Sequence, residues 1–354
     1  MKIGILTWFF GNNYGARAHS YALQQIFRNM GHECYMINYV PADAWKSNII
    51  MNLNCGQSKK HPILAVRCLI RCIKFNKQRK IYNLSDKVKC AEDINKLGLD
   101  AVEIGSDEIF KLDHPFCSDI YFGVGINTSK FMYAPSSGQT PEDAVLSIQR
   151  INSIKKMEGI AVRDKHTQQL IYNNCNKNAL IVLDPTLLYD FSELISQNIH
   201  EKDYILIYSF SQWNEYKNKI QAYARQKQLK IVCVGRYCKW ADKSYDTADL
   251  STWIGLFSKA SLVVTDSFHG VVFAIKFHKQ MLIFGRGDKL NKINDLLNTL
   301  QVCVQFYAGE KEVELHLIDN SIDYKKVDVI LDRKKEKSEK YIQLTLDKIS
   351  KRGV

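Results

Sequence analysis

The sequence predicts an α/β protein with two Rossmann-like domains, and three observations lead to this prediction. Residues 3–8 form an apolar strand, residues 16–30 carry apolar side chains at helical spacing, and residues 34–39 form a second strand. Short buried strands then recur along the chain, each ending in polar residues. The strand pattern starts again at residues 204–208, after a polar stretch. Such β-loop-α-β beginnings are typical of doubly wound domains.

We expect the domain boundary within residues 189–203, which are polar and show no strong periodicity. The N-terminal domain would span residues 1–190, with a basic insertion at residues 46–85. The C-terminal domain would span residues 203–330. A charged helix over residues 334–351 has an apolar side, so we expect it to pack back across the junction.

Composition indicates an ordinary globular protein with a basic excess. The 354 residues are 46% hydrophobic and 24% charged, and Lys plus Arg exceed Asp plus Glu by 12. This excess favours anionic partners, namely phosphorylated metabolites, acidic lipid headgroups or nucleic acid. The ten cysteines contain no Cys-x-x-Cys pair and no zinc spacing, which suits a reducing compartment and predicts no metal site.

The N-terminus indicates a first strand and not a signal peptide, because it lacks a long apolar core followed by small residues. No apolar run approaches the length that spans a bilayer. We therefore expect a cytoplasmic protein, or one that is peripheral at the inner face of the cytoplasmic membrane.

The basic insertion contains a candidate amphipathic helix at residues 62–82. Residues 46–85 include no acid and nine Lys or Arg. Such a helix can be an ordinary surface helix whose apolar side meets the core, or it can lie on an anionic membrane. Nucleic acid is not expected as a partner, because the chain has no recognised nucleic-acid module and its basic run has few aromatic residues.

The segment from Ala260 to Gly270 combines a buried strand, a polar turn and a helix start. The apolar run at residues 262–264 indicates the strand, and Asp266 or Ser267 is suited to cap the helix that follows. Open α/β sheets bind ligands beyond the carboxyl ends of their strands, and helix N-termini attract anions. His269 could hold an anion there and move a proton. The alternative is that His269 only caps or packs. The first strand-helix unit lacks Gly-x-Gly-x-x-Gly, which disfavours a dinucleotide site.

Taken together, these segments resemble the polysaccharide pyruvyl transferase family over roughly residues 1–305. The matching segments, in the family's order, are Asn13-Tyr14-Gly15-Ala16, Tyr21-Ala22-Leu23-Gln24, Gly105-Ser106-Asp107, Tyr133-Ala134 with Ser136 and Gly138, Val162-Arg163-Asp164, Asp184-Pro185-Thr186 and Asp266-Ser267-Phe268-His269-Gly270. The departures are Glu108, Phe110, Pro135 and Lys292, where members more often have Gln, Trp, Ala and Arg.

The resemblance implies two Rossmann-like domains facing across a cleft, as in GT-B glycosyltransferases. It implies phosphoenolpyruvate as donor, a sugar as acceptor, a cyclic ketal as product, and no cofactor or metal. His269 takes the catalytic role and Arg163 contacts the donor, since a guanidinium can bind a carboxylate or phosphate as a fork.

Further site residues follow from the matched motifs. Backbone N–H groups near Ser267 and Gly270 would hold the phosphate, and Arg286, with Lys289, is a further candidate for the donor. The acceptor side of the cleft is assigned to Asn13, Tyr14, Gly15, Ser106, Asp107 and Ser136. Four other histidines lie outside the matched catalytic positions, and we expect their alanine variants to keep most activity: His19, His32, His114 and His278.

The sequence leaves three functions open. The first is a pyruvyl transferase that acts on a sugar. The acceptor we favour is a lipid-linked precursor of a surface polysaccharide, such as an exopolysaccharide or a capsule. The second is a GT-B glycosyltransferase that uses a nucleotide sugar, because fold alone does not separate the two. The third is a non-catalytic protein that binds a membrane or nucleic acid, which only the charge suggests.

Overall fold

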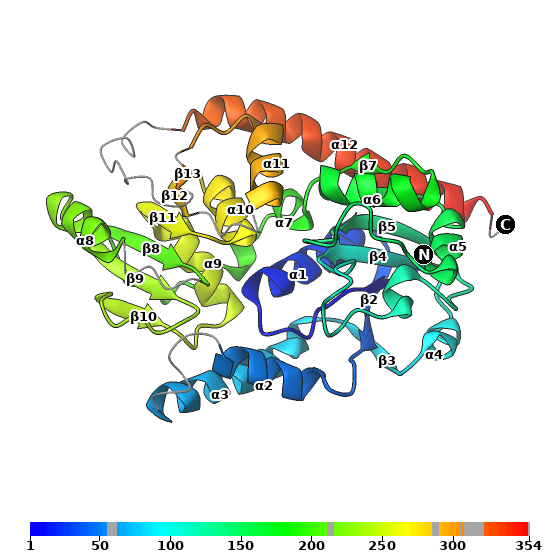
Figure 1. The fold of residues 1–354 in the computed structure, drawn as a ribbon, viewed down its shortest axis with the longest axis horizontal. Helices are drawn as coiled ribbons and strands as arrows, with labels where there is room; N and C mark the ends of the chain where they lie inside the picture. Colours follow the sequence, from blue (N-terminus) through cyan, green and yellow to red (C-terminus); the bar gives the residue numbers. More distant parts are fainter. Residues whose placement is uncertain (55–61, 211–215, 285–289, 305, 308–321, 353–354) are drawn as a thin grey trace. The chain divides into compact units, whose positions relative to one another are not determined.

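The computed structural model describes residues 1–54, 62–210, 216–284, 290–304, 306–307 and 322–352, and it divides into two compact units. Unit 1 comprises Met1–Trp45, Arg79–Asp190 and Val329–Val354, and unit 2 comprises Lys46–Gln78 and Phe191–Asp328. Each unit is a parallel β-sheet whose strands are joined by helices (Figure 1). The prediction of two Rossmann-like α/β domains is confirmed.

In unit 1 the sheet has the strand order β3-β2-β1-β4-β5-β6-β7. These strands are β1 (Lys2–Leu6), β2 (Glu33–Tyr39), β3 (Leu84–Val88), β4 (Ala101–Asp107), β5 (Ser129–Pro135), β6 (Ile160–Val162) and β7 (Leu180–Ile181). The order runs outward in both directions from the β1–β4 pair. Ligands of doubly wound sheets bind at such a switch point, beyond the carboxyl ends of the strands.

The helices that follow strands of unit 1 are α1 (Tyr14–Asn29), α4 (Ala91–Asn95), α5 (Ile148–Lys155), α6 (Lys165–Cys175) and α7 (Pro185–Leu188). Side chains cap the starts of all of these except α4. Helix α1 follows β1, and its N-cap Asn13 accepts hydrogen bonds from the backbone N–H groups of Gly15 (2.9 Å) and Ala16 (3.4 Å). This cap fixes where α1 starts, next to the switch point.

In unit 2 the sheet has the strand order β10-β9-β8-β11-β12-β13. These strands are β8 (Tyr204–Tyr208), β9 (Lys230–Val234), β10 (Lys243–Tyr245), β11 (Leu262–Thr265), β12 (Gln280–Phe284) and β13 (Phe306–Tyr307). The helices that lie between these strands along the chain are α8 (Lys217–Gln226), α9 (Leu250–Lys259), α10 (Phe268–Lys276) and α11 (Leu290–Leu300). The switch point of this sheet lies between β8 and β11.

The basic insertion differs from its expected place in the N-terminal domain. It contains α2 (Ala44–Asn54) and α3 (Pro62–Lys77), and residues 46–78 group with unit 2. The reason is a set of polar contacts that α3 makes within unit 2. Arg67 pairs with Asp246, and Lys74 donates a hydrogen bond to the carbonyl of Thr247 (3.1 Å).

The terminal helix α12 (Tyr324–Ser350) begins ten residues before the expected start at residue 334. Its first residues belong to unit 2 and the rest to unit 1. Tyr324 donates a hydrogen bond to the carbonyl of Lys279 (2.5 Å), and Tyr341 donates one to the carbonyl of Met132 (2.7 Å). The predicted start was too late, because the first turns already carry apolar or aromatic side chains at five of their ten positions: Tyr324, Val327, Val329, Ile330 and Leu331.

The centre of the unit 1 sheet contains one acid in an apolar setting. Glu103 lies in the middle of β4, in register with Ile5 of β1 and Phe131 of β5, and it is fully buried. Burial raises the pKa of Glu103 well above its ordinary value, and the backbone N–H of Tyr133 opposes this only in part. Burial therefore favours the neutral form of Glu103 in the folded protein.

We expect Glu103→Gln to remove a loss of stability that the wild type shows as the pH rises. The unfolded chain ionises Glu103 near its ordinary pKa of 4.5, whereas the folded protein keeps the proton. The folded state thus binds more protons, so its stability falls above that pH by up to roughly 1.4 kcal/mol per pH unit. Urea denaturation of both proteins between about pH 5 and pH 8 measures the difference. Parallel pH profiles for the two proteins would show that Glu103 is not held neutral.

Candidate active site

At the switch point of unit 2, a carboxylate links the ends of the two central strands by hydrogen bonds. Asp266 follows β11, and its two oxygens accept hydrogen bonds from the Ser209 hydroxyl and the Phe210 backbone N–H, both at 2.9 Å. Ser209 and Phe210 follow β8, the neighbouring strand. Asp266 therefore connects the ends of the two central strands. Of the two residues predicted to cap α10, Asp266 and Ser267, it is not the one at the N-cap position. Ser267 occupies the N-cap position, but its side chain makes no capping hydrogen bond.

His269 is the second residue of α10 and is buried. Its ring packs edge-on against Phe268, with 5.3 Å between the ring centroids. Gly270 follows because a Cβ at this position would lie 2.1 Å from Oγ1 of Thr265. That Oγ1 donates to the carbonyl of Tyr208 (2.6 Å) and accepts from the N–H of Ser267 (3.1 Å). Thr265 thus fixes the turn from which His269 projects.

A cation lies beside this turn. Nζ of Lys292, in α11, is 5.6 Å from the centroid of the Phe268 ring. Lys292 is therefore close to Phe268, the first residue of α10. The N-terminus of a helix favours anions. The other predicted donor residue of this region, Arg286, and its neighbour Lys289 lie outside the described residues.

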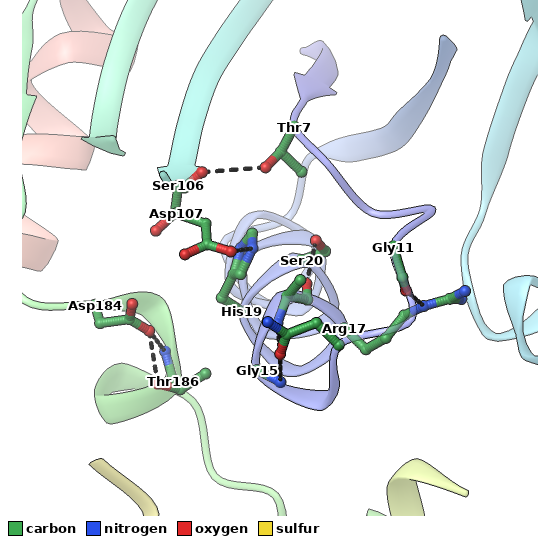
Figure 2. A network of polar contacts seen from close by, with 12 residues as sticks. Thr7, Gly11, Gly15, Arg17, His19, Ser20, Ser106, Asp107, Asp184 and Thr186 are labelled. Carbon is green, nitrogen blue, oxygen red and sulfur yellow. Dashed lines mark hydrogen bonds and ion pairs between the residues drawn. The ribbon is translucent and has the colours of Figure 1, made fainter. Parts of the chain in front are cut away.

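The switch point of unit 1 is crossed by two contacts, which Figure 2 shows. The Thr7 hydroxyl after β1 donates to the Ser106 carbonyl at the end of β4 (3.2 Å). Nε2 of His19, in α1, lies 3.5 Å from Oδ2 of Asp107. Asp107 has a positive φ of 68°, a conformation that aspartate adopts more readily than most residues. Gly105 permits this strand end, since a Cβ there would lie 1.9 Å from the Tyr133 carbonyl oxygen.

Arg163 lies in the same unit, between two carboxylates. It follows β6, and its Nη1 is 2.9 Å from Oδ2 of Asp184 and 3.5 Å from Oδ1 of Asp107. Burial lowers the pKa of Arg163, but the carboxylates of Asp184, Asp107 and Asp164 outweigh this effect and raise it above the ordinary value. The guanidinium is thus permanently charged. Asp107 lies beside both Arg163 and His19, so one carboxylate connects the end of β4 with α1 and with the residue that follows β6.

The residues assigned to the acceptor differ in their surroundings. Asp107 keeps 14% of its side chain exposed, and Asn13 is exposed at the start of α1. The other four are buried: Tyr14, Gly15, Ser106 and Ser136. The Ser106 hydroxyl donates to the Ala134 carbonyl (3.1 Å), and the Ser136 hydroxyl accepts from the Gly138 N–H (3.2 Å). These two serines thus bond to backbone in this structure.

Sequence reasoning missed two residues that the structure brings to these sites. His19 was set aside as unmatched, yet it is fully buried next to Asp107. Lys292 was noted only as a departure from the family pattern, yet it lies against Phe268. Strand order supplies the missing signal for His19, because β1 and β4 are neighbours and so the loops that follow them meet.

Two searches of the described ranges bear on other kinds of site. No group of three or more His, Cys, Asp or Glu side chains is arranged there to hold a metal ion. None of the helices in these ranges combines the length and the apolar character that crossing a bilayer requires.

Comparison with known proteins identifies a family and a fold. Residues 13–288 match the model of the polysaccharide pyruvyl transferase family. None of the curated proteins matches the sequence. A UDP-N-acetylglucosamine 2-epimerase from Rickettsia bellii has a similar structure, with a TM-score of 0.51, 10% identity and coverage of 99% of this chain and 97% of that one. The spinosyn forosaminyltransferase SpnP is similar too, with a TM-score of 0.51, 10% identity and 99% of each chain covered. At this identity, the likeness to these two structures shows the fold alone.

Proposed function

The chain belongs to the polysaccharide pyruvyl transferase family, and we propose that it transfers pyruvate from phosphoenolpyruvate to a sugar as a cyclic ketal. One observation carries this proposal. The family match includes the turn from Asp266 to Gly270, which sets His269 at a helix start beside the switch point of unit 2. That position suits a group that handles an anion and a proton.

The proposed reaction needs neither an oxidant nor a reductant. A proton adds to the methylene carbon of phosphoenolpyruvate, and the first sugar hydroxyl bonds through its oxygen to the central carbon and loses its proton. Phosphate then leaves with the electron pair of its bond to that carbon. The second hydroxyl bonds to the same carbon and also loses a proton. Of the two hydroxyl protons, one balances the new methyl group and one balances the released phosphate.

The residues of unit 2 suit the donor half of this reaction. We assign the proton transfer to His269. The donor's phosphate would bind at the start of α10, near Ser267 and Gly270, where first-turn N–H groups and the helix dipole favour an anion. Lys292 would add a positive charge there, and Arg286 keeps its proposed place on the donor.

The residues of unit 1 suit the acceptor half. Asp107 is partly exposed and lies beside His19 and Arg163, so we assign to it the proton that leaves a sugar hydroxyl. Asn13 would contact the acceptor from the start of α1, with Tyr14, Gly15, Ser106 and Ser136 shaping the turns behind. For Arg163 to contact the donor, an anion would have to replace Asp107, the more distant of its two carboxylate partners.

We also propose a cytoplasmic protein whose acceptor is a lipid-linked precursor of a surface polysaccharide. A peripheral contact with an anionic membrane would bring the protein to such an acceptor, and the net charge of +12 suits that contact.

The test is phosphate release from phosphoenolpyruvate by the purified protein, with free and lipid-linked galactosides, glucosides and mannosides as acceptors. We expect phosphate release that requires an acceptor, and a product that carries a pyruvate ketal. A parallel series with nucleotide sugars serves as the control for the glycosyltransferase alternative. Nucleotide release without any phosphate release from phosphoenolpyruvate would replace the proposal by that alternative.

A further inference from the structure

Helix α3 turns its basic side toward the protein. Arg67 donates two hydrogen bonds to the carboxylate of Asp246, from Nε (2.5 Å) and Nη2 (2.9 Å). Arg71 is buried and donates to the carbonyl of Gly235, after β9. Phe75 and Cys72 are buried on the same side of the helix. The basic residues thus attach α3 to the loops of unit 2 that follow β9 and β10.

The opposite side of α3 is apolar and exposed to solvent. Its five large side chains follow helical spacing and are between 42% and 72% exposed: Ile63, Val66, Leu69, Ile70 and Ile73. We call these five residues the α3 stripe. An amphipathic helix on a globular protein ordinarily faces the core with its apolar side, so α3 has the reverse orientation. An exposed apolar row of this size marks a surface for a partner or a membrane.

The charges around the α3 stripe favour one kind of partner. Residues 46–78 contain no Asp or Glu. Lys77, in the last turn of α3, is exposed. An exposed lysine beside an apolar stripe suits the interface of a bilayer with anionic lipids, where apolar side chains enter the headgroup boundary and cations remain at the surface. A second copy of this chain fits less well, since it would bring the same positive segment against this one.

We propose that the α3 stripe inserts into the surface of an anionic lipid bilayer while the basic side of α3 holds the helix to unit 2. This inference names the surface behind the membrane contact proposed above. The basic side chains of Arg67, Arg71 and Lys74 are not part of this membrane contact, because all three bond within unit 2. It does not depend on the donor or the acceptor of the reaction, because vesicle binding needs neither.

The experiment compares the full-length wild type with a triple variant, Ile63→Gln, Val66→Gln and Ile70→Gln. Glutamine favours the helix about as well as the residues it replaces, and all three positions are exposed, so the fold should persist. The matched control changes three similarly exposed apolar residues of unit 1 to Gln: Val145, Ile148 and Leu344. Flotation with phosphatidylcholine vesicles, with and without phosphatidylglycerol, measures binding, and thermal unfolding checks the fold.

We expect the wild type and the control to bind phosphatidylglycerol vesicles. The triple variant should lose about tenfold or more in affinity for the same vesicles. Lys77→Glu should weaken binding to these vesicles without changing the melting temperature. Equal binding by the wild type and a folded triple variant would overturn the proposal, and so would equal binding of the wild type to neutral and anionic vesicles. A wild type that ignores vesicles but forms a dimer, which the triple variant loses, would assign the α3 stripe to a second copy instead.

Discussion

The His269→Ala variant is expected to lose two or more orders of magnitude in turnover while it keeps its fold. A positioned side chain that transfers a proton contributes about 10²–10⁴-fold in rate, and no neighbour in the turn from Asp266 to Gly270 can carry a proton in the same way near neutral pH. His269→Gln should be nearly as inactive, because an amide can hydrogen-bond but does not relay a proton. The measurement is initial phosphate release at saturating phosphoenolpyruvate and acceptor.

The chain offers a matched control for this loss. His278 follows the same helix, but its ring is exposed, stacks on Tyr324 and pairs with Asp328 at 2.9 Å. We expect His278→Ala to stay within a few-fold of the wild type. Because His269 is buried, circular dichroism and thermal unfolding must show that the His269 variants are folded. A folded His269→Ala protein with activity close to that of the wild type would remove this histidine from the mechanism.

The sequence was most informative where a strand is buried on both faces. The strand at residues 204–208 was predicted with the bounds of β8, and the strand at residues 262–264 is β11 without its last residue. Both are short apolar runs followed by polar residues, which is the pattern of a parallel strand in an α/β protein. Strands β3 and β10 escaped prediction because they lie at sheet edges, and half or more of their residues are polar.

The orientation of α3 could not be predicted from its residues. Its pattern shows two sides, but periodicity does not state which side meets the protein. Partners far along the chain decide this, since Asp246 and the carbonyls of Gly235 and Thr247 attract the basic side. The pairing of His19 with Asp107 was missed for a similar reason. It depends on β1 and β4 being neighbours, which local sequence does not encode.

The largest expected loss of stability in unit 1 follows from removing the partner of a buried charge. Asp184 accepts hydrogen bonds from the N–H (3.0 Å) and the hydroxyl (2.6 Å) of Thr186, while its other oxygen receives Nη1 of Arg163. Both ionic side chains are almost wholly buried. Removing one partner of a buried ion pair typically lowers the free energy of unfolding by about 3–5 kcal/mol, because the remaining charge stays buried without its counter-charge. We expect Asp184→Ala to lower the free energy of unfolding by about this amount, as measured by urea denaturation.

Asp164 separates the ion pair from the helix cap in this measurement. It is buried as well, and it caps α6 through the N–H (2.8 Å) and the hydroxyl (2.6 Å) of Thr167, just as Asp184 caps α7. The charge of Asp164 helps to raise the pKa of Arg163. The close ion pair of Arg163, at 2.9 Å, is with Asp184. Asp164→Ala should therefore cost mainly the cap, about 1 kcal/mol. Equal losses for the two variants would mean that the Arg163–Asp184 pair adds little to the fold.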